Sequence, residues 1–347
     1  MKNNHTQGRC TRILVIQTAF IGDIILTTPM LRAVKKRYPH ASVDVLVTPR
    51  TAELLIGNPH IDEIMTYDKR GEARGIVNFL RVARALRRHV YEVALLPHRS
   101  WRSAFLAFCA HIPDRIGFDA SPASVLYTHT VTYQRDVHET ERNLHLLSPL
   151  GLNAADPTPE IHTSRDDEER AREHLKMDAA DEGRIVVGVG AGSVWPTKRW
   201  LPEGFADVAD RLIAERGADV ILFGGPDDVD VCNRIASAMK HRPLIAAGRL
   251  SLRESAALIA RCRVFVSNDT GLMHLAAAVR VPVVAIFGAT VPAFGFAPYG
   301  DMHTIIEKTL PCRPCGTHGT RRCTEGTFAC MREIHPGEVY EAIVTYL

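Results

Sequence analysis

The feature that most constrains the fold is a regular alternation of short apolar runs with amphipathic stretches of helical length. Predicted strands cover residues 12–17, 42–47, 63–67, 92–96 and 115–117 in the first half, and 185–189, 219–223, 244–246, 264–267 and 283–287 in the second. Helical stretches separate them, at residues 23–37, 50–57, 75–89, 101–110, 138–150, 202–216, 227–239, 252–260 and 270–279. Continuous apolar strands that alternate with helices indicate parallel sheets covered on both faces. The pattern therefore predicts an α/β chain with two doubly wound parallel sheets.

Two domains are predicted, because 347 residues suffice for two separate cores. Residues 151–159 are rich in Pro, Asp and Asn, and a strand-like segment at 160–163 and a charged helix at 165–177 follow them. We expect an N-terminal domain at 1–160, a linker region at 161–182, a second domain at 183–335 and a C-terminal helix at 336–347. Tandem doubly wound domains are expected to face each other across a cleft at the carboxyl edges of their sheets.

Composition excludes several classes of protein. Hydrophobic residues make up 46% and charged residues 23%, as in globular proteins, and no apolar window is long enough for a membrane helix. Residues 1–12 lack the apolar core of a secretion signal, so we expect a cytoplasmic protein. Residues 1–150 carry 20 Lys and Arg against 13 Asp and Glu, whereas the remainder carries 22 against 26. The basic first half is either a solvated face or the side that meets an anionic partner, and no nucleic-acid partner is expected.

The first strand–helix junction contains Gly22 and Asp23. It does not match the dinucleotide-binding glycine pattern, which argues against a nicotinamide or flavin enzyme. Gly22 allows a tight turn or the close approach of a ligand. Asp23 either caps the following helix, a contribution of about 1 kcal/mol, or acts at the sheet edge. Pro29 indicates that this helix kinks or begins near Thr28.

Two loops of the second half are candidate nucleotide-binding segments. In the segment 188–200, glycine amides can wrap an anion and Lys198 and Arg199 add positive charge, although a loop with solvated cations is the alternative. In the segment 222–228, Gly224 allows a ligand to approach the strand end, and Asp227 either caps the next helix or binds hydroxyl groups.

A third loop runs from an apolar strand through Asp269, Thr270 and Gly271 directly into a helix of small residues. Backbone amides at a helix start, together with the helix dipole, favour an anion there. Thr270 and His274 are four residues apart and share one helical face. His274 is either a packed core residue or a ligand contact.

Together these segments resemble glycosyltransferase family 9, the bacterial lipopolysaccharide heptosyltransferases. The matching motifs are Ile21-Gly-Asp-Ile-Ile-Leu-Thr-Thr-Pro29, Thr197-Lys-Arg-Trp200 and Ser267-Asn-Asp-Thr-Gly-Leu-Met-His-Leu-Ala276, with weaker matches at residues 112–117 and 222–225. They occur in the family's order over nearly the whole chain. Within the family, the chain is most similar to the heptosyltransferase II branch.

The resemblance implies a GT-B fold, an ADP-L-glycero-D-manno-heptose donor and inverting transfer to the anionic inner core of lipopolysaccharide, with no cofactor required. It implies that Asp23 is the general base, with Gly22 and Arg99 as acceptor-binding candidates. Residues implied to bind the donor are Lys198, Arg199, Gly224, Asp269, Thr270, Gly271 and His274. Transfer to a lipid acceptor implies a peripheral position on the cytoplasmic face of the inner membrane. Four arginines in the helix 75–89 form a candidate surface for anionic headgroups, and an ordinary domain helix is the alternative.

Cys312, Cys315, Cys323 and Cys330 form a cluster near the C-terminus. They could hold a structural zinc, although the spacing differs from that of standard zinc ribbons; reduced thiols and disulfides are the alternatives. Two other functions remain open from the residues: a GT-B sugar-nucleotide epimerase, and a non-catalytic sugar-nucleotide binder in which Asp23 only caps a helix.

Overall fold

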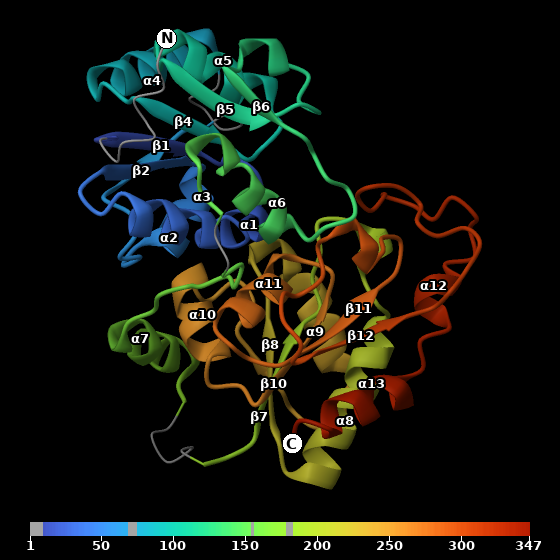
Figure 1. Ribbon diagram of the computed structural model, residues 1–347. Coiled ribbons are helices and arrows are strands. Elements are labelled where there is room, and N and C mark those ends of the chain that lie inside the picture. Colours follow the sequence, from blue (N-terminus) through green and yellow to red (C-terminus); the bar gives the residue numbers. More distant parts are fainter. Residues whose placement is uncertain (1–9, 69–74, 154–155, 178–182) are drawn as a thin grey trace. The chain divides into compact units, whose positions relative to one another are not determined.

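The computed structural model describes residues 10–68, 75–153, 156–177 and 183–347, and the chain divides into two compact units, 1–162 and 163–347. Each unit contains one six-stranded sheet with the same strand order, β3-β2-β1-β4-β5-β6 in the first and β9-β8-β7-β10-β11-β12 in the second (Figure 1). All strand pairs are parallel. The direction of winding reverses between β1 and β4 and between β7 and β10. Ligands of doubly wound sheets bind beside such a switch point, at the carboxyl ends of the strands.

The first unit packs helices on both faces of its sheet. Its strands are β1 (Arg12–Ile16), β2 (Ser42–Val47), β3 (Glu63–Thr66), β4 (Val93–Leu96), β5 (Asp114–Phe118) and β6 (His129–Val131). Its helices are α1 (Ile21–Ile25), α2 (Thr28–Arg37), α3 (Pro49–Ala52), α4 (Ile76–Arg88), α5 (Trp101–Cys109) and α6 (Glu139–His145), with short 3-10 helices at Glu53–Leu55, Ser124–Leu126 and Ser148–Leu150. Side chains alternate between the faces of a strand, so Val15 packs with α2 and α6, and Leu14 packs with α4 and α5.

The second unit has the same layered arrangement. Its strands are β7 (Val186–Gly190), β8 (Asp219–Phe223), β9 (Leu244–Ile245), β10 (Val264–Asn268), β11 (Val283–Phe287) and β12 (His303–Glu307). Its helices are α7 (Arg165–Leu175), α8 (Pro202–Arg216), α9 (Val229–Ala238), α10 (Leu252–Ile259), α11 (Gly271–Ala278), α12 (Ala329–Arg332) and α13 (Pro336–Val344), with 3-10 helices at Pro196–Lys198, Pro226–Asp228 and Pro292–Phe294. One core joins α8, α9 and α13 to the sheet and includes the buried Trp200.

The strands predicted within the two sheets are present, with bounds shifted by no more than one residue. Two edge strands, β6 and β12, were not predicted, because they are only half-buried and lack a continuous apolar run. The strand predicted at 160–163 is wrong. Instead, the backbone amide of Glu160 donates to Thr28 Oγ1 at 3.0 Å, and its carboxylate pairs with Arg32 at 2.7 Å. The predicted helix 23–37 is divided into α1 and α2, and the break falls just before Pro29.

The boundary between the two units falls within the segment that we predicted as a linker. Helix α7 of that segment is part of the second unit, since Asp167 pairs with Arg253 of α10 at 2.6 Å. Residues 178–182 of the predicted linker lie outside the described residues. The C-terminal helix α13 is not a separate element, because Val339, Tyr340 and Ile343 are buried in the core of the second unit. In the described part of the chain, no helix is both long and apolar enough to cross a membrane.

Candidate active site

The switch point of the second sheet is held together by Asn268, the last residue of β10. Its Oδ1 accepts the backbone amide of Trp200 at 2.9 Å, and its Nδ2 donates to the carbonyl of Ala191 at 2.7 Å. All three residues are buried. Asn268 therefore ties both ends of the loop after β7 to the end of β10, and this loop carries Lys198.

Lys198 and Asp269 form an ion pair at this edge. Lys198 Nζ lies 2.5 Å from Asp269 Oδ2, and the side chains are only 13% and 8% exposed. Thr290, which follows β11, donates its hydroxyl to the same carboxylate oxygen at 2.6 Å. The segments that follow β7, β10 and β11 thus meet at the carboxylate of Asp269. A nearly buried carboxylate needs its cation, so Asp269 orients Lys198.

Helix α11 begins beside this pair. Thr270 is its N-cap residue, and Gly271 is its first helical residue. His274 lies in the first turn and is buried. Since the first amides of a helix have no intrahelical acceptor and the dipole is positive there, this end can bind an anion next to Lys198. The structure therefore gathers Lys198, Asp269, Thr270, Gly271 and His274 at the carboxyl edge; their roles remain predictions.

The glycines of this region serve packing. A Cβ atom on Gly188 or Gly190 would overlap the ring of Phe265. Both residues lie inside β7, which pairs with β8 and β10, so the prediction that their amides wrap an anion is wrong for these two. It stays a prediction for Gly192, which follows the strand. A Cβ on Gly224 would come within 2.6 Å of Cβ of Asp228. These glycines are required because neighbouring side chains fill the space beside them.

Two polar residues in the loops after β7 and β8 form contacts that the sequence did not predict. Asp228, not Asp227, caps the turn before α9, since its Oδ2 accepts the amide of Gly225 at 3.0 Å. Arg199 donates from Nε and Nη2 to the carbonyl of Ser193, at 2.8 and 2.5 Å. Two of its donors therefore close the loop on itself.

The switch point of the first sheet carries Asp23. This residue lies in the first turn of α1, directly after β1, and its Oδ2 accepts the amide of Phe20 at 3.1 Å. Asp23 therefore caps helix α1, and this contact leaves its proposed role as a base untested. Gly22 is helical and is not among the glycines with positive φ, so the tight-turn explanation for Gly22 is wrong.

Arg99 follows β4, on the other side of the same switch point. Its guanidinium carbon lies 4.1 Å from the centre of the Tyr133 ring. Arg142 of α6 lies 4.9 Å from the same centre, and its Nη1 donates to Tyr133 Oη at 2.6 Å and to Glu139 Oε2 at 2.5 Å. Two arginines thus flank one aromatic ring at this edge.

Glu139 is the ionisable residue of this region that sequence reasoning missed. Burial raises the pKa of Glu139 to about 7; Arg142 opposes this shift, and the negative charge of Asp23 adds to it. No local pattern distinguishes Glu139 and Arg142 from an exposed helical ion pair. Thr290, by contrast, could have been found, because it follows the predicted strand at 283–287.

The cysteine-rich segment packs against the segments that follow β7 and β11. The nearly buried Arg313 donates to the carbonyl of Thr290 and the carboxylate of Glu307, each at 2.8 Å. Thr197 Oγ1 donates to the carbonyl of Thr320 at 2.9 Å. The segment is therefore attached to the loop of Lys198 and to the end of β11.

The cysteines of this segment are free thiols. Burial raises the pKa of Cys330 to about 11, whereas backbone amides, above all that of Phe328, lower the pKa of Cys323. Within the described residues, the single group of three potential metal ligands that lie within 4.8 Å is Asp44, Glu63 and His89. No three of these cysteines have Sγ atoms that all lie within 4.8 Å of one another, although Cys312, Cys315 and Cys323 lie near enough to Cys330 to add to the rise of its pKa.

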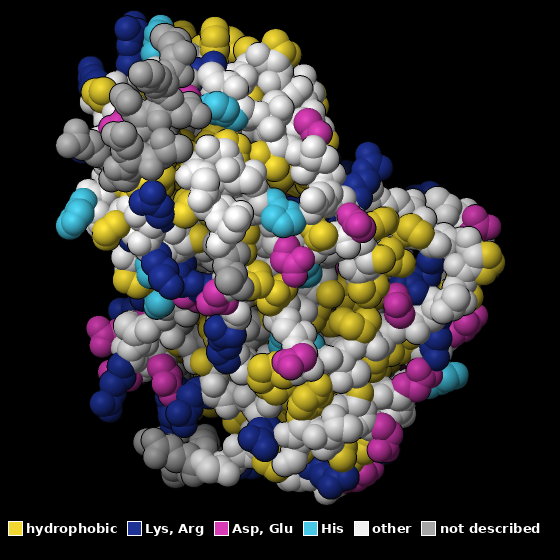
Figure 2. Space-filling view, in the orientation of Figure 1, with side chains coloured by type: hydrophobic (Ala, Val, Ile, Leu, Met, Phe, Trp, Pro, Cys, Tyr) yellow, Lys and Arg dark blue, Asp and Glu magenta, His cyan; other side chains and the backbone are white. Residues whose placement is uncertain are grey.

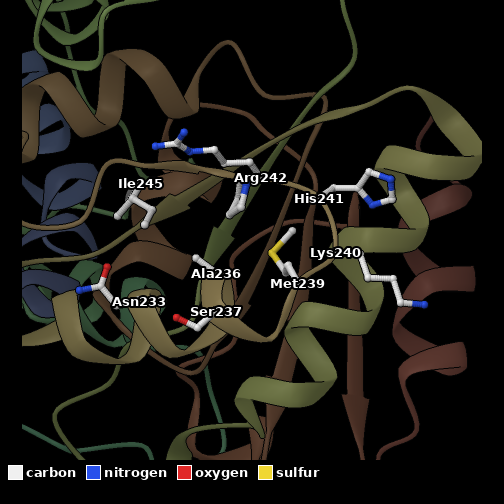
Figure 3. A pocket seen from close by; sticks show the side chains of 9 residues that line it. Asn233, Ala236, Ser237, Met239, Lys240, His241, Arg242 and Ile245 are labelled. Carbon is white, nitrogen blue, oxygen red and sulfur yellow. The ribbon is translucent and has the colours of Figure 1, made fainter.

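A surface hollow lies at the opposite, amino-terminal edge of the second sheet, between the end of α9 and the start of β9 (Figure 3). Asp210 fixes the adjoining loop by accepting the amides of Lys240 and His241, each at 2.8 Å. In Figure 3 the side chains of Lys240 and Arg242 point apart, so these two cations do not converge on one ligand there. The hollow contains none of the predicted site residues.

Comparisons with known proteins identify the family to which this chain belongs. The sequence profile of glycosyltransferase family 9 (heptosyltransferase) matches residues 79–324. The chain is 30% identical to lipopolysaccharide heptosyltransferase 2 of Salmonella typhimurium, over 97% of this chain and 98% of that one. The chain belongs to glycosyltransferase family 9.

Other family 9 proteins similar to this chain include an enzyme of a different type and a solved structure. Lipopolysaccharide heptosyltransferase 3 of Escherichia coli is 31% identical over 78% of this chain and 82% of its own length. A solved family 9 glycosyltransferase from Veillonella parvula superimposes with a TM-score of 0.87 at 26% identity, covering 100% of this chain and 98% of that one. The predicted GT-B fold is thereby confirmed.

Membership of family 9 decides between the functions left open by the residues. The protein is a heptosyltransferase, not an epimerase or a non-catalytic binder. The family implies an ADP-heptose donor and a lipopolysaccharide acceptor. Similar identity to enzymes of types 2 and 3 leaves the type of this family 9 member undecided.

The raised pKa of Glu139 predicts a pH-dependent stability for this heptosyltransferase. A carboxyl group whose pKa is higher in the folded state than in the unfolded state stabilises the fold when protonated, and this contribution is lost as pH rises towards 7. Relative to Glu139→Gln, the free energy of unfolding of the wild type should fall by about 2 kcal/mol between about pH 5 and pH 8. Urea unfolding of both proteins across this range measures the difference. Parallel curves would show that Glu139 is ionised throughout.

Proposed function

We propose that this protein is an inverting heptosyltransferase of type II, which moves L-glycero-D-manno-heptose from ADP-heptose to an inner core that already carries one heptose. The observation that carries the proposal is the matched placement of two functional groups. Asp23 and the Lys198–Asp269 pair each lie at the carboxyl edge and switch point of a sheet, and the two sheets have the same strand order. Similarity to heptosyltransferase 2 of S. typhimurium over nearly the whole chain supports the choice of type.

The donor diphosphate is proposed to bind at the start of α11. The amides of the first turn and Lys198 would neutralise its charge, and Thr270 and His274 would contact the nucleotide sugar. Asp269 would keep Lys198 in position through their ion pair. Charge that develops on the leaving ADP is stabilised by the same cation and helix dipole. No cofactor or catalytic metal is part of this proposal.

Asp23 is proposed to act as the general base. Its carboxylate takes the proton of the acceptor hydroxyl, and the oxygen attacks the anomeric carbon of the heptose. The bond from that carbon to the diphosphate breaks on the opposite face, and ADP leaves with the electron pair, which inverts the configuration. Arg99 and Gly22 would contact the anionic acceptor, which is reached from the cytoplasmic face of the inner membrane.

A structural zinc on the cysteine-rich segment is a separate proposal. It requires Cys312, Cys315, Cys323 and Cys330 to come closer together than they do in this structure. Elemental analysis of the purified protein tests it: about one zinc per chain supports the site, and none rejects it.

Three delipidated acceptors test the proposed type. They carry Kdo with no heptose, one heptose or two heptoses, and each is incubated with ADP-heptose. Rapid transfer to the acceptor with one heptose alone supports type II. Preference for either of the other acceptors would keep the heptosyltransferase and overturn the type, and the absence of transfer to all three would overturn the ADP-heptose reaction itself.

A further inference from the structure

Large exposed hydrophobic side chains concentrate on helices α4 and α5 of the first unit. We call them the α4–α5 patch, which consists of Ile76, Val77, Leu80, Trp101, Phe105 and Phe108. Hydrophobic and basic side chains also gather over the top of this unit in Figure 2, where Figure 1 places α4 and α5. Exposed apolar residues that are scattered singly need no explanation, whereas a contiguous group indicates an interaction surface.

Aromatic contacts join the two helices beside the patch. Phe79 of α4 stacks on Phe105 of α5 with ring centres 5.4 Å apart, and Phe105 lies 6.5 Å from Phe108. Trp101, Phe105 and Phe108 follow a helical spacing that places them on one side of α5. The inward side of α4 is already occupied by Phe79, Ala83 and Leu86, which pack in the core. The patch is therefore a second, outward apolar side.

Arginines surround the patch. Arg81, Arg84, Arg87 and Arg88 of α4 are exposed, and the guanidinium carbons of Arg102 and Arg115 lie 5.5 and 5.6 Å from the ring centres of Trp101 and Phe108. Between residues 76 and 111 there are six arginines and a single acidic residue, Glu92. Exposed apolar and aromatic side chains bordered by basic ones are typical of surfaces that lie in a membrane interface.

We propose that the α4–α5 patch docks the protein on an anionic lipid bilayer. The inference rests on the proposed function, because a lipid-linked acceptor is presented at such a surface. Trp101 lies two residues beyond Arg99, so the patch begins at the edge that carries Asp23. Charge excludes a second copy as the occupant, since a symmetric contact would place arginines against arginines.

Vesicle co-sedimentation of the full chain tests the proposal. The probes are vesicles of phosphatidylcholine, with or without phosphatidylglycerol. We expect the wild type to bind the anionic vesicles and to release them as salt is raised. Leu80→Ser/Phe108→Ser should weaken this binding by at least about tenfold, because two apolar side chains no longer enter the interface. Arg84→Gln/Arg88→Gln should weaken binding to anionic vesicles and reduce its salt dependence.

A matched control is available outside the patch. Ile56 is 51% exposed, as is Leu80, and Met302 is 41% exposed, close to the 48% of Phe108. Ile56→Ser/Met302→Ser should bind vesicles like the wild type. Transfer to a delipidated acceptor should be unchanged in all of these variants, which also shows that they are folded.

Two results would overturn the proposal directly. One is that the patch variants bind anionic vesicles like the wild type. The other is that Ile56→Ser/Met302→Ser loses as much vesicle binding as the patch variants do. A change from dimer to monomer in the patch variants, with vesicle binding intact, would assign the patch to a contact between copies. Because vesicle binding is measured without turnover, failure of the heptosyltransferase reaction would be seen separately, in the delipidated assay.

Discussion

Replacing Asp23 with Asn should lower kcat for heptose transfer by about 10²–10⁴-fold while leaving ADP binding within about twofold of the wild type. Asn has the shape of Asp and can still accept the amide of Phe20, which the carboxylate accepts at 3.1 Å. Helix α1 should therefore remain capped, and only the ability to take a proton is lost. Single-turnover transfer, calorimetric ADP binding and thermal unfolding of the variant measure the three expectations.

Glu254→Gln is the matched control for Asp23→Asn. Glu254 lies in the first turn of α10, and its carboxylate likewise accepts an amide three residues earlier, that of Ser251 at 2.8 Å. Its variant should keep full turnover. If Asp23→Asn also kept full turnover, Asp23 would be a capping residue only. If it lost turnover and stability together, the effect would be structural.

Replacing Lys198 with Ala should weaken ADP binding by about 10- to 100-fold, since a charge-assisted contact to a phosphate contributes roughly 1.5–3 kcal/mol. The loss of ADP affinity in Lys198→Ala has a second cause, the charge left on Asp269. Asp269 is 8% exposed and would lose its cation while it keeps the hydroxyl of Thr290, so its carboxylate would repel the diphosphate. Asp269→Asn added to Lys198→Ala should therefore restore part of the affinity. Calorimetric titrations with ADP, UDP and GDP measure these effects, and a preference for ADP is expected.

AMP separates a contact to the diphosphate from a general change in the loop. Lys198→Ala should weaken binding of ADP much more than binding of AMP, because the lysine is proposed to contact the diphosphate. Lys308→Ala is the control: it also removes a lysine from an ion pair of the second unit, that with Glu338 at 2.7 Å, and should leave both affinities unchanged. An equal loss for ADP and AMP in Lys198→Ala would contradict the proposed contact.

Much of the arrangement around Lys198 was predictable because parallel strands leave their carboxyl ends at one edge. Lys198, Asp269 and Thr270 each follow a predicted strand, so chain direction alone brings them to that edge. The glycines were misinterpreted for a related reason. A sequence shows that Gly188 and Gly190 lack side chains, but not that the ring of Phe265 occupies the space beside them.

The two α/β halves, almost every strand within them and the family were predictable from the amino-acid sequence, because apolar periodicity and strand-end motifs are local properties. Three features became visible only in the folded chain: Lys198 pairs with Asp269, Glu139 lies near enough to Asp23 for their charges to interact, and both α4 and α5 expose apolar side chains. Each of these depends on which strands are neighbours and which helix side meets the sheet. Such contacts join residues far apart in the chain, so no local pattern specifies them; they follow from the packing of the whole unit.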